Sequence, residues 1–143
     1  MGLEALSRGA SRADLVEPKR PAAQAVRRNI EALDAEHAIL HQRPLKHVLQ
    51  ELSARVGSVE LPEGFDYIFL DPPYKQGKMF GLLVAETIAQ SGLLHPDGIF
   101  IQETDAADQG YNYEEFGLMT ERMKRYGNTR VTYYKRSAGE LGR

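Results

Sequence analysis

A short apolar run in the middle of the chain ends abruptly at an acid, two prolines and an aromatic ring. The run Tyr67–Leu70 is followed by Asp71, Pro72, Pro73 and Tyr74. A short run rich in β-forming residues predicts a strand that is buried on both faces. Because proline has no N–H and a fixed φ, the strand cannot continue through Pro72. We therefore expect Asp71–Tyr74 to form a stiff segment at the carboxyl end of the strand, which we call the lip.

The residues of this lip suit the methylation of an exocyclic amine on a nucleic-acid base. The Asp71 carboxylate and the Pro72 carbonyl can accept the two N–H donors of a planar NH2 group, and Tyr74 can stack on the base. In open α/β sheets, ligands bind at the carboxyl ends of strands, which is where the lip lies. The same residues also suit an ordinary turn at the end of a strand, because Asp and Pro are common in turns.

The composition limits the classes of protein to which the chain can belong. Its 143 residues, 42% hydrophobic and 27% charged, are typical of one soluble domain with a core of its own, and we expect a single domain over residues 1–143. The absence of Cys excludes disulfides and thiolate metal sites. No secretory signal or membrane-spanning run is visible, so we expect a cytoplasmic protein. The net charge of −2 gives no general sign of nucleic-acid binding.

The apolar spacing predicts helices and strands in regular alternation. Helices are expected at residues 1–10, 21–33, 45–56 and 80–92, and strands at residues 13–17, 38–40, 67–70 and 99–103. A turn is expected over Leu93–Gly98, a polar loop over Thr104–Glu115, and a hairpin around Gly127-Asn128. This order predicts an α/β fold with a doubly wound, mostly parallel sheet and a C-terminal antiparallel hairpin.

Five segments occur together in one order along the chain. They are Gly2–Ala10 (GLEALSRGA), Leu15–Glu17 (LVE), Asp66–Tyr74 (DYIFLDPPY), Gln102–Thr104 (QET) and Tyr126–Tyr134 (YGNTRVTYY). Over nearly the whole chain they resemble the RsmD-type 16S rRNA guanine-N2 methyltransferases. The resemblance implies a Rossmann-like methyltransferase fold, S-adenosylmethionine (SAM) as the methyl donor, and a guanine N2 amine of small-subunit rRNA as the acceptor.

The resemblance also implies roles for the lip. Asp71 and the Pro72 carbonyl would accept from the target amine, Pro73 would stiffen the lip, and Tyr74 would stack on the base. Asp71 would also lie at the cofactor. Lys75 and Lys78, which flank the lip, are the best candidates for contacts with RNA phosphates.

The remaining cofactor residues are expected near the N-terminus and after the strand at residues 38–40. Glu17, followed by Pro18, would hold the SAM ribose hydroxyls, although taken alone Glu17 suits a solvated strand end. Gly2 would represent the last glycine of a SAM loop, and Gln42 and Arg43 would lie near the adenine. Related enzymes often carry an acid where this chain has Arg43, so we assign no hydrogen bond from that position to the adenine amine. The four histidines form no metal-ligand pattern, and no metal is expected.

The chain departs from the family at its start. Family members carry a strand and a glycine-rich loop directly upstream of the segment that begins at Gly2, so we expect the first strand to be absent. Its absence would leave the strands at Ala13–Glu17 and Tyr67–Leu70 with unpaired edges. We therefore expect a monomer that can associate through these edges.

Two other functions remain open. One is an adenine or cytosine amino-methyltransferase acting on DNA or RNA, because the Asp-Pro-Pro-Tyr motif also serves those bases. The other is a truncated, non-enzymatic remnant of the fold, for which the missing glycine loop argues.

Overall fold

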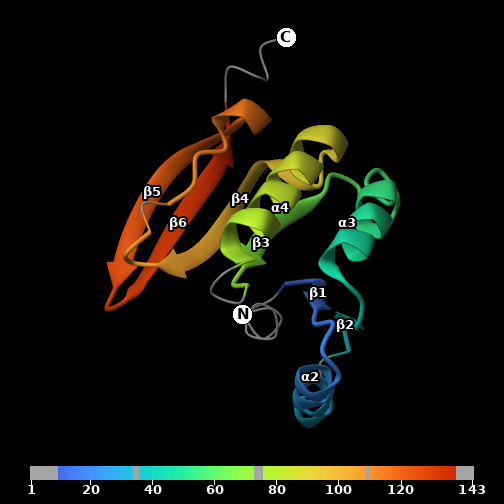
Figure 1. The fold of residues 1–143 in the computed structure, drawn as a ribbon. Coiled ribbons are helices and arrows are strands. Elements are labelled where there is room, and N and C mark those ends of the chain that lie inside the picture. Colours follow the sequence, from blue (N-terminus) through green and yellow to red (C-terminus); the bar gives the residue numbers. More distant parts are fainter. Residues whose placement is uncertain (1–9, 34–35, 73–75, 109, 138–143) are drawn as a thin grey trace. The chain divides into compact units, whose positions relative to one another are not determined.

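The computed structural model describes residues 10–33, 36–72, 76–108 and 110–137 (Figure 1). By its internal contacts the chain divides into two compact units, residues 1–49 and residues 50–143. The predicted helix at the N-terminus, apart from Ala10, lies outside the described residues, and so do Pro73 and Tyr74 of the lip and Lys75, which follows it.

The first unit contains two short parallel strands and the helix between them. β1 (Ala13–Val16) pairs in parallel with β2 (Ala38–His41), and α2 (Arg20–Ala32) connects the two strands. Pro21 lies in the first turn of α2, where its missing N–H leaves no helical hydrogen bond unmade, and Ala23 is buried. The predicted strand–helix–strand order is thus present. α3 (Leu45–Ala54) follows β2 and begins at the predicted residue.

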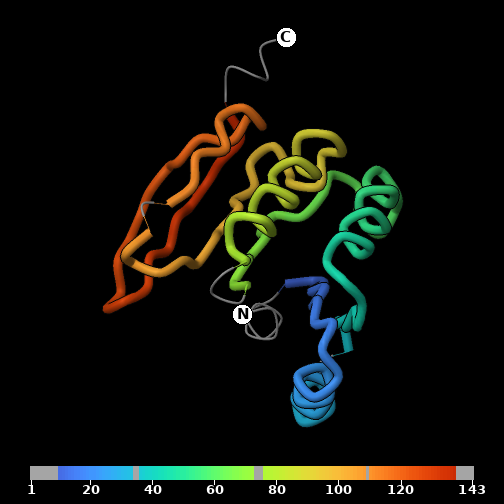
Figure 2. The backbone as a smooth tube through the Cα atoms, viewed as in Figure 1, coloured from blue at the N-terminus to red at the C-terminus, as the bar shows by residue number. Residues whose placement is uncertain are grey.

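The second unit is built on a four-stranded sheet in the order β3-β4-β6-β5. β3 (Phe65–Leu70) and β4 (Leu94–Asp105) are parallel, with α4 (Gly77–Ser91) between them in the chain. β6 (Thr129–Arg136) is antiparallel to both β4 and β5 (Leu118–Tyr126). Figure 2 shows the long hairpin that β5 and β6 form, as predicted.

The core of this unit lies between α4 and the sheet. Val84 and Ile88 of α4 are buried, and so is Phe100 of β4. The ring of Tyr134, on β6, lies 5.5 Å from the ring of Phe100 and 4.9 Å from that of Tyr113, between centroids. Tyr113 directly precedes a short 3-10 helix, η2 (Glu114–Phe116). These rings fix the sheet, α4 and the segment before η2 against one another.

In the described part of the chain the sheet edges are formed by β1, β2, β3 and β5, and two of these strands are of interest for the expected missing strand. β1 pairs with β2 alone, and β3 pairs with β4 alone. These are the two strands that the sequence predicted to have an unpaired edge. Among the described helices, none is long and apolar enough to cross a membrane.

The prediction of a turn over Leu93–Gly98, with the strand beginning only after it, is wrong, because β4 already begins at Leu94. Pairing with β3 shifts between Phe65↔Leu94 and Tyr67↔Ile99, so the turn residues form a bulge inside the strand. A Cβ at Gly98 would lie 3.0 Å from the Asp66 carbonyl oxygen, and the bulge therefore needs a glycine there. The predicted polar loop also begins later than expected, after Asp105.

Candidate functional site

Asp71 and Pro72 directly follow β3, as the sequence predicted. Asp71 is exposed and Pro72 is half-buried. Because β3 and β4 are parallel and Leu70 pairs with Gln102, the next residues, Asp71 and Glu103, are neighbours across the two strands. The acid of the lip therefore has a second acid beside it.

A cavity of about 340 Å³ opens at this end of the sheet. Its lining residues come from the end of β3, the start of α4, the end of β4, the loop after β4, and the turn between β5 and β6 with the start of β6. They are Asp71, Pro72, Gly77, Glu103, Thr104, Asp105, Asp108, Tyr111, Asn128 and Thr129. The structure thus places Asp71 and Pro72 in a cavity, and adds lining residues that the sequence did not single out. A second cavity, of about 250 Å³, contains neither of the two lip residues.

The charges around the larger cavity are all negative. Its lining carries four carboxyl groups, and in the described chain no Lys or Arg lines it. Burial, and then the negative charge of Asp71, raise the pKa of Glu103 above its usual 4.5. Within the described residues, no cluster of three or more His, Asp or Glu side chains could hold a metal ion. The cavity therefore favours hydrogen-bond donors or a cationic group over an anion.

A buried hydrogen-bond network holds the start of α4 at the cavity. Gln102 is fully buried; its Nε2 donates to the Gly77 carbonyl at 2.9 Å, and its Oε1 accepts from the Tyr113 hydroxyl at 2.6 Å. Burial is the largest cause of a raised Tyr113 pKa, so the phenol keeps the proton that it donates. A Cβ at Gly81 would overlap the Tyr113 hydroxyl, so this glycine lets α4 approach the network. In the sequence, Gln102 was identified only as part of the QET segment, and nothing there indicated that it pairs with Tyr113 and Gly77.

The predicted cofactor residues of the first unit lie at the carboxyl ends of β1 and β2. Val16 and His41, the last residues of β1 and β2, are paired, so Glu17 and Gln42 directly follow neighbouring strands. The Glu17 carboxylate accepts the Lys19 N–H at 3.1 Å, and Gln42 Oε1 accepts from Arg27 Nη2 at 3.1 Å. Pro18 and Arg43, the residues after these two, are exposed. Gly2 lies outside the described residues.

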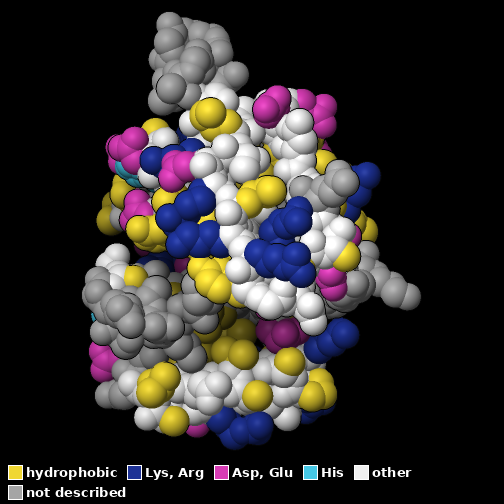
Figure 3. All heavy atoms as spheres, turned by 90° about the vertical axis from the view of Figure 1, so that its left-hand side faces the viewer, with side chains coloured by type: hydrophobic (Ala, Val, Ile, Leu, Met, Phe, Trp, Pro, Cys, Tyr) yellow, Lys and Arg dark blue, Asp and Glu magenta, His cyan; other side chains and the backbone are white. Residues whose placement is uncertain are grey.

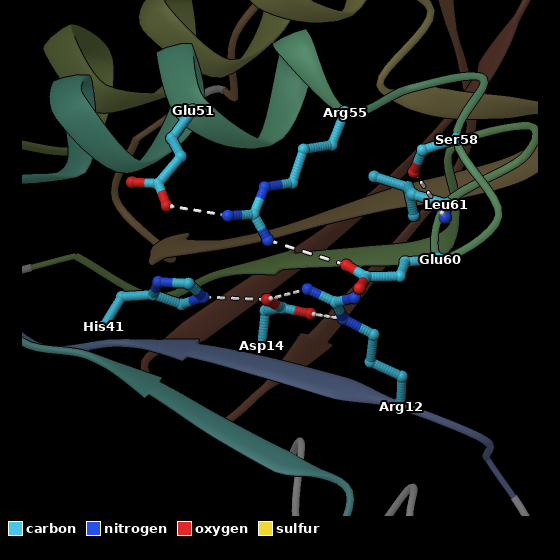
Figure 4. Close-up of polar contacts among 8 residues, drawn as sticks. All are labelled: Arg12, Asp14, His41, Glu51, Arg55, Ser58, Glu60 and Leu61. Atoms are coloured by element: carbon cyan, nitrogen blue, oxygen red, sulfur yellow. Dashed lines mark hydrogen bonds and ion pairs between the residues drawn. The ribbon is translucent and has the colours of Figure 1, made fainter.

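A charged cluster joins the two strands of this unit (Figure 4). The Asp14 carboxylate accepts hydrogen bonds from Arg12 Nε and Nη2 at 2.7 and 3.0 Å, and lies 2.7 Å from His41 Nε2. Because an ionised carboxylate can only accept, the His41 ring nitrogen is the donor. Burial alone would raise the pKa of Asp14, but Arg12 and His41 together lower it below the usual 3.8. The cluster therefore uses the His41 ring for a structural contact between the two strands.

Basic side chains lie on the hairpin of β5 and β6 and at the start of α4. Figure 3 shows Lys and Arg side chains on the face that carries β5 and β6. Several of them have partners in the protein: the Arg122 guanidinium lies 4.6 Å from the centroid of the Tyr133 ring, and Lys135 Nζ lies 3.5 Å from the Glu121 carboxylate. Lys78, one of the predicted phosphate contacts, is exposed in the first turn of α4.

Comparison with known proteins gives consistent matches over nearly the whole chain. The family model described as "Conserved hypothetical protein 95" matches residues 1–135. "Putative rRNA methyltransferase YlbH" of Bacillus subtilis (strain 168) is 33% identical over 138 residues, which are 95% of this chain and 70% of YlbH. Among solved structures, a conserved hypothetical protein of Streptococcus pyogenes has a TM-score of 0.72 and 29% identity, over 96% of this chain and 78% of its own. "Putative methyltransferase yhhF" from Escherichia coli has a TM-score of 0.70 and 24% identity, over 96% and 69%.

These matches confirm the predicted fold class, a SAM-dependent methyltransferase fold with a C-terminal antiparallel hairpin. The family model spans all but the last few residues of the chain. The chain belongs to the conserved hypothetical protein 95 family, the RsmD-type methyltransferase family that its sequence resembles.

Proposed function

We propose that this protein transfers a methyl group from SAM to the exocyclic N2 amine of a guanine in 16S rRNA of the small ribosomal subunit. Family membership and the name of the relative YlbH support an rRNA methyltransferase. The observation that carries the proposal further is the cavity at the end of β3, in which Asp71 and Pro72 lie among acceptor groups and no Lys or Arg of the described chain is present.

In this proposal the protein contributes mainly alignment. The Asp71 carboxylate and the Pro72 carbonyl accept the two N–H groups of the amine, which turns the nitrogen lone pair towards the methyl carbon. With SAM bound, the nitrogen would form the new N–C bond while the C–S bond breaks and its electron pair stays on sulfur, and the proton that then leaves the nitrogen would pass to the solvent. Asp71 stabilises the positive charge that develops on nitrogen. Pro73 stiffens the lip, and Tyr74 stacks on the base.

The residues at the ends of β1 and β2 fit the cofactor. SAM supplies a methyl group on a sulfonium, which needs no acid catalyst. The Glu17 carboxylate uses one oxygen for the Lys19 N–H and retains acceptor positions for two ribose hydroxyls. Gln42 Oε1 is occupied by Arg27, which leaves its amide N–H groups as donors for a ring nitrogen of adenine. Pro18 and Arg43 would border the same nucleoside, and Gly2 would lie beside its methionine part.

The RNA backbone must be held outside the acidic cavity, because phosphates would be repelled there. Lys78, which is exposed at the start of α4, would contact a phosphate next to the target nucleotide, and Lys75 would do the same.

The test is a methylation assay on small ribosomal subunits and on free 16S rRNA, both taken from cells that lack the gene. The purified chain is incubated with SAM that carries a labelled methyl group, and the RNA is digested to nucleosides for mass spectrometry. We expect labelled N2-methylguanosine, and none with Asp71→Ala, which should retain most of the SAM affinity.

Other outcomes would overturn the proposal. Label in N6-methyladenosine or N4-methylcytosine would establish the adenine or cytosine alternative instead. No label from a folded chain that binds SAM would exclude these substrates, and no SAM binding by a folded chain would identify it as a non-enzymatic remnant. A near-normal rate in Asp71→Ala would remove Asp71 from the mechanism.

A further inference from the structure

Asp71 and Glu103 form a pair of carboxyl groups on one wall of the cavity. They lie side by side because Leu70 and Gln102, the residues before them, are paired in the parallel ladder of β3 and β4. Both line the same cavity, and they are close enough for the charge of Asp71 to raise the pKa of Glu103. Any base edge that reaches Asp71 therefore also meets Glu103.

Two adjacent carboxylates present acceptors only, and base edges differ in what they offer to such a pair. Guanine carries its N2 amine beside a ring N1–H, so the amine and N1 are two adjacent donors on that edge, whereas N3, on the other side of the amine, carries a lone pair. Adenine and cytosine carry an amine next to a ring nitrogen with a lone pair. A carboxylate facing that lone pair would meet a second acceptor, which is repulsive and leaves both groups unpaired.

We propose that Glu103 is a specificity-determining residue, whose carboxylate accepts the N1–H of the target guanine while Asp71 accepts from the N2 amine. The inference rests on the proposed function and adds to it the reason for choosing guanine. The surrounding charge supports it, because Asp105 and Asp108 also line the cavity and favour a donor-rich edge over a phosphate.

The inference is tested with the nucleotide that the methylation assay identifies. Two versions of the 16S rRNA are assembled by ligation, one with guanosine and one with 2-aminopurine riboside at that position. 2-Aminopurine keeps the N2 amine but has a lone pair at N1. We expect the wild-type kcat/KM for 2-aminopurine to be about 10-fold to 100-fold below that for guanosine.

The Glu103→Gln variant then assigns this preference to one residue. Because 2-aminopurine also lacks O6, the wild-type ratio alone does not identify the contact. A Gln amide can donate to the N1 lone pair, so we expect the variant to lose rate on guanosine and the ratio between the two substrates to approach one. Glu86→Gln, a matched change on the exposed surface of α4, should leave rates and ratio as in the wild type.

The possible failures are distinguishable. If the wild-type chain methylates no guanosine, the proposed function fails. If it methylates guanosine and 2-aminopurine equally well, Glu103 does not read N1–H, although the proposed function stands. Glu103 also does not read N1–H if Glu103→Gln is folded, binds SAM and keeps the wild-type ratio of kcat/KM between the two substrates; the proposed function again stands. The wild-type comparison needs no variant, so equal rates on the two substrates would overturn the inference even if Glu103→Gln did not fold.

Discussion

The Tyr113 hydroxyl donates a 2.6 Å hydrogen bond to Oε1 of Gln102, and both side chains are buried. Gln102 in turn donates to the carbonyl of Gly77, the first residue of α4 and part of the cavity wall. The aromatic core and the cavity are therefore joined by one short chain of hydrogen bonds. Removing either end should affect the other.

Tyr113→Phe should lower the free energy of unfolding by about 1–3 kcal/mol, because it leaves the buried Oε1 of Gln102 without a donor. Urea unfolding followed by circular dichroism measures this change. Tyr126→Phe is the matched control, since the Tyr126 side chain is 57% exposed. A loss in Tyr113→Phe no larger than in this control would mean that the hydrogen bond contributes nothing to stability.

Gly81→Ala should destabilise the protein, although alanine is ordinarily favoured over glycine inside a helix by about 1 kcal/mol. Its Cβ would overlap the Tyr113 hydroxyl and lie 2.9 Å from Gln102 Oε1, so α4 or the network must move. We expect a loss of about 1–3 kcal/mol in the free energy of unfolding. Gly77→Ala is the control in the same helix, because its Cβ would meet its nearest neighbour, Tyr111 Oη, at 3.4 Å. Stabilisation by Gly81→Ala would contradict the close packing of α4 on the network.

Local signals in the sequence were sufficient to predict most of the helices and strands. The hairpin followed from Gly127-Asn128 between two runs of β-formers, and the end of α4 from Gly92, which has the positive φ of 71° that a helix stop needs. The start of β4 was missed because His95–Gly98 reads as a turn. The structure absorbs these residues as a bulge, since pairing with β3 continues on both sides of it.

The cavity could be predicted only in part. Asp71 and Pro72 were identified because one continuous segment carries the signal. Asn128, Thr129 and Tyr111 reach the cavity from other elements, and their proximity depends on strand register and packing, which a sequence does not display. The same reasoning could have predicted Glu103 as a residue of the site, because it is also an acid at the carboxyl end of an apolar strand.

Asp14→Asn should destabilise the protein near neutral pH and much less in acid. The folded-state pKa of Asp14 is lowered, so its ionised form contributes stability above the unfolded value of 3.8, and this contribution is lost as the pH falls through the lower, folded value. We expect the wild type to exceed Asp14→Asn by about 1–3 kcal/mol in free energy of unfolding near pH 6, and the difference to shrink below about pH 4.

Urea unfolding of both proteins across this pH range measures the difference. Asp97→Asn, at an exposed position in the bulge of β4, is the control and should change stability by less than about 0.5 kcal/mol. A difference between wild type and Asp14→Asn that does not depend on pH would show that the Asp14 charge is not what stabilises the cluster.

Glu17→Ala should weaken SAM binding about 10-fold to 100-fold, because it removes the carboxylate proposed to hold the ribose hydroxyls. Titration calorimetry with the purified chain measures the dissociation constant, and thermal unfolding checks that the variant is folded. Glu31→Ala removes the same charge from an exposed position on α2 and should leave the constant unchanged. Equal affinity in wild type and Glu17→Ala would place the ribose elsewhere. A loss in Glu17→Ala alone would assign the end of β1 to the cofactor, whichever base the enzyme methylates.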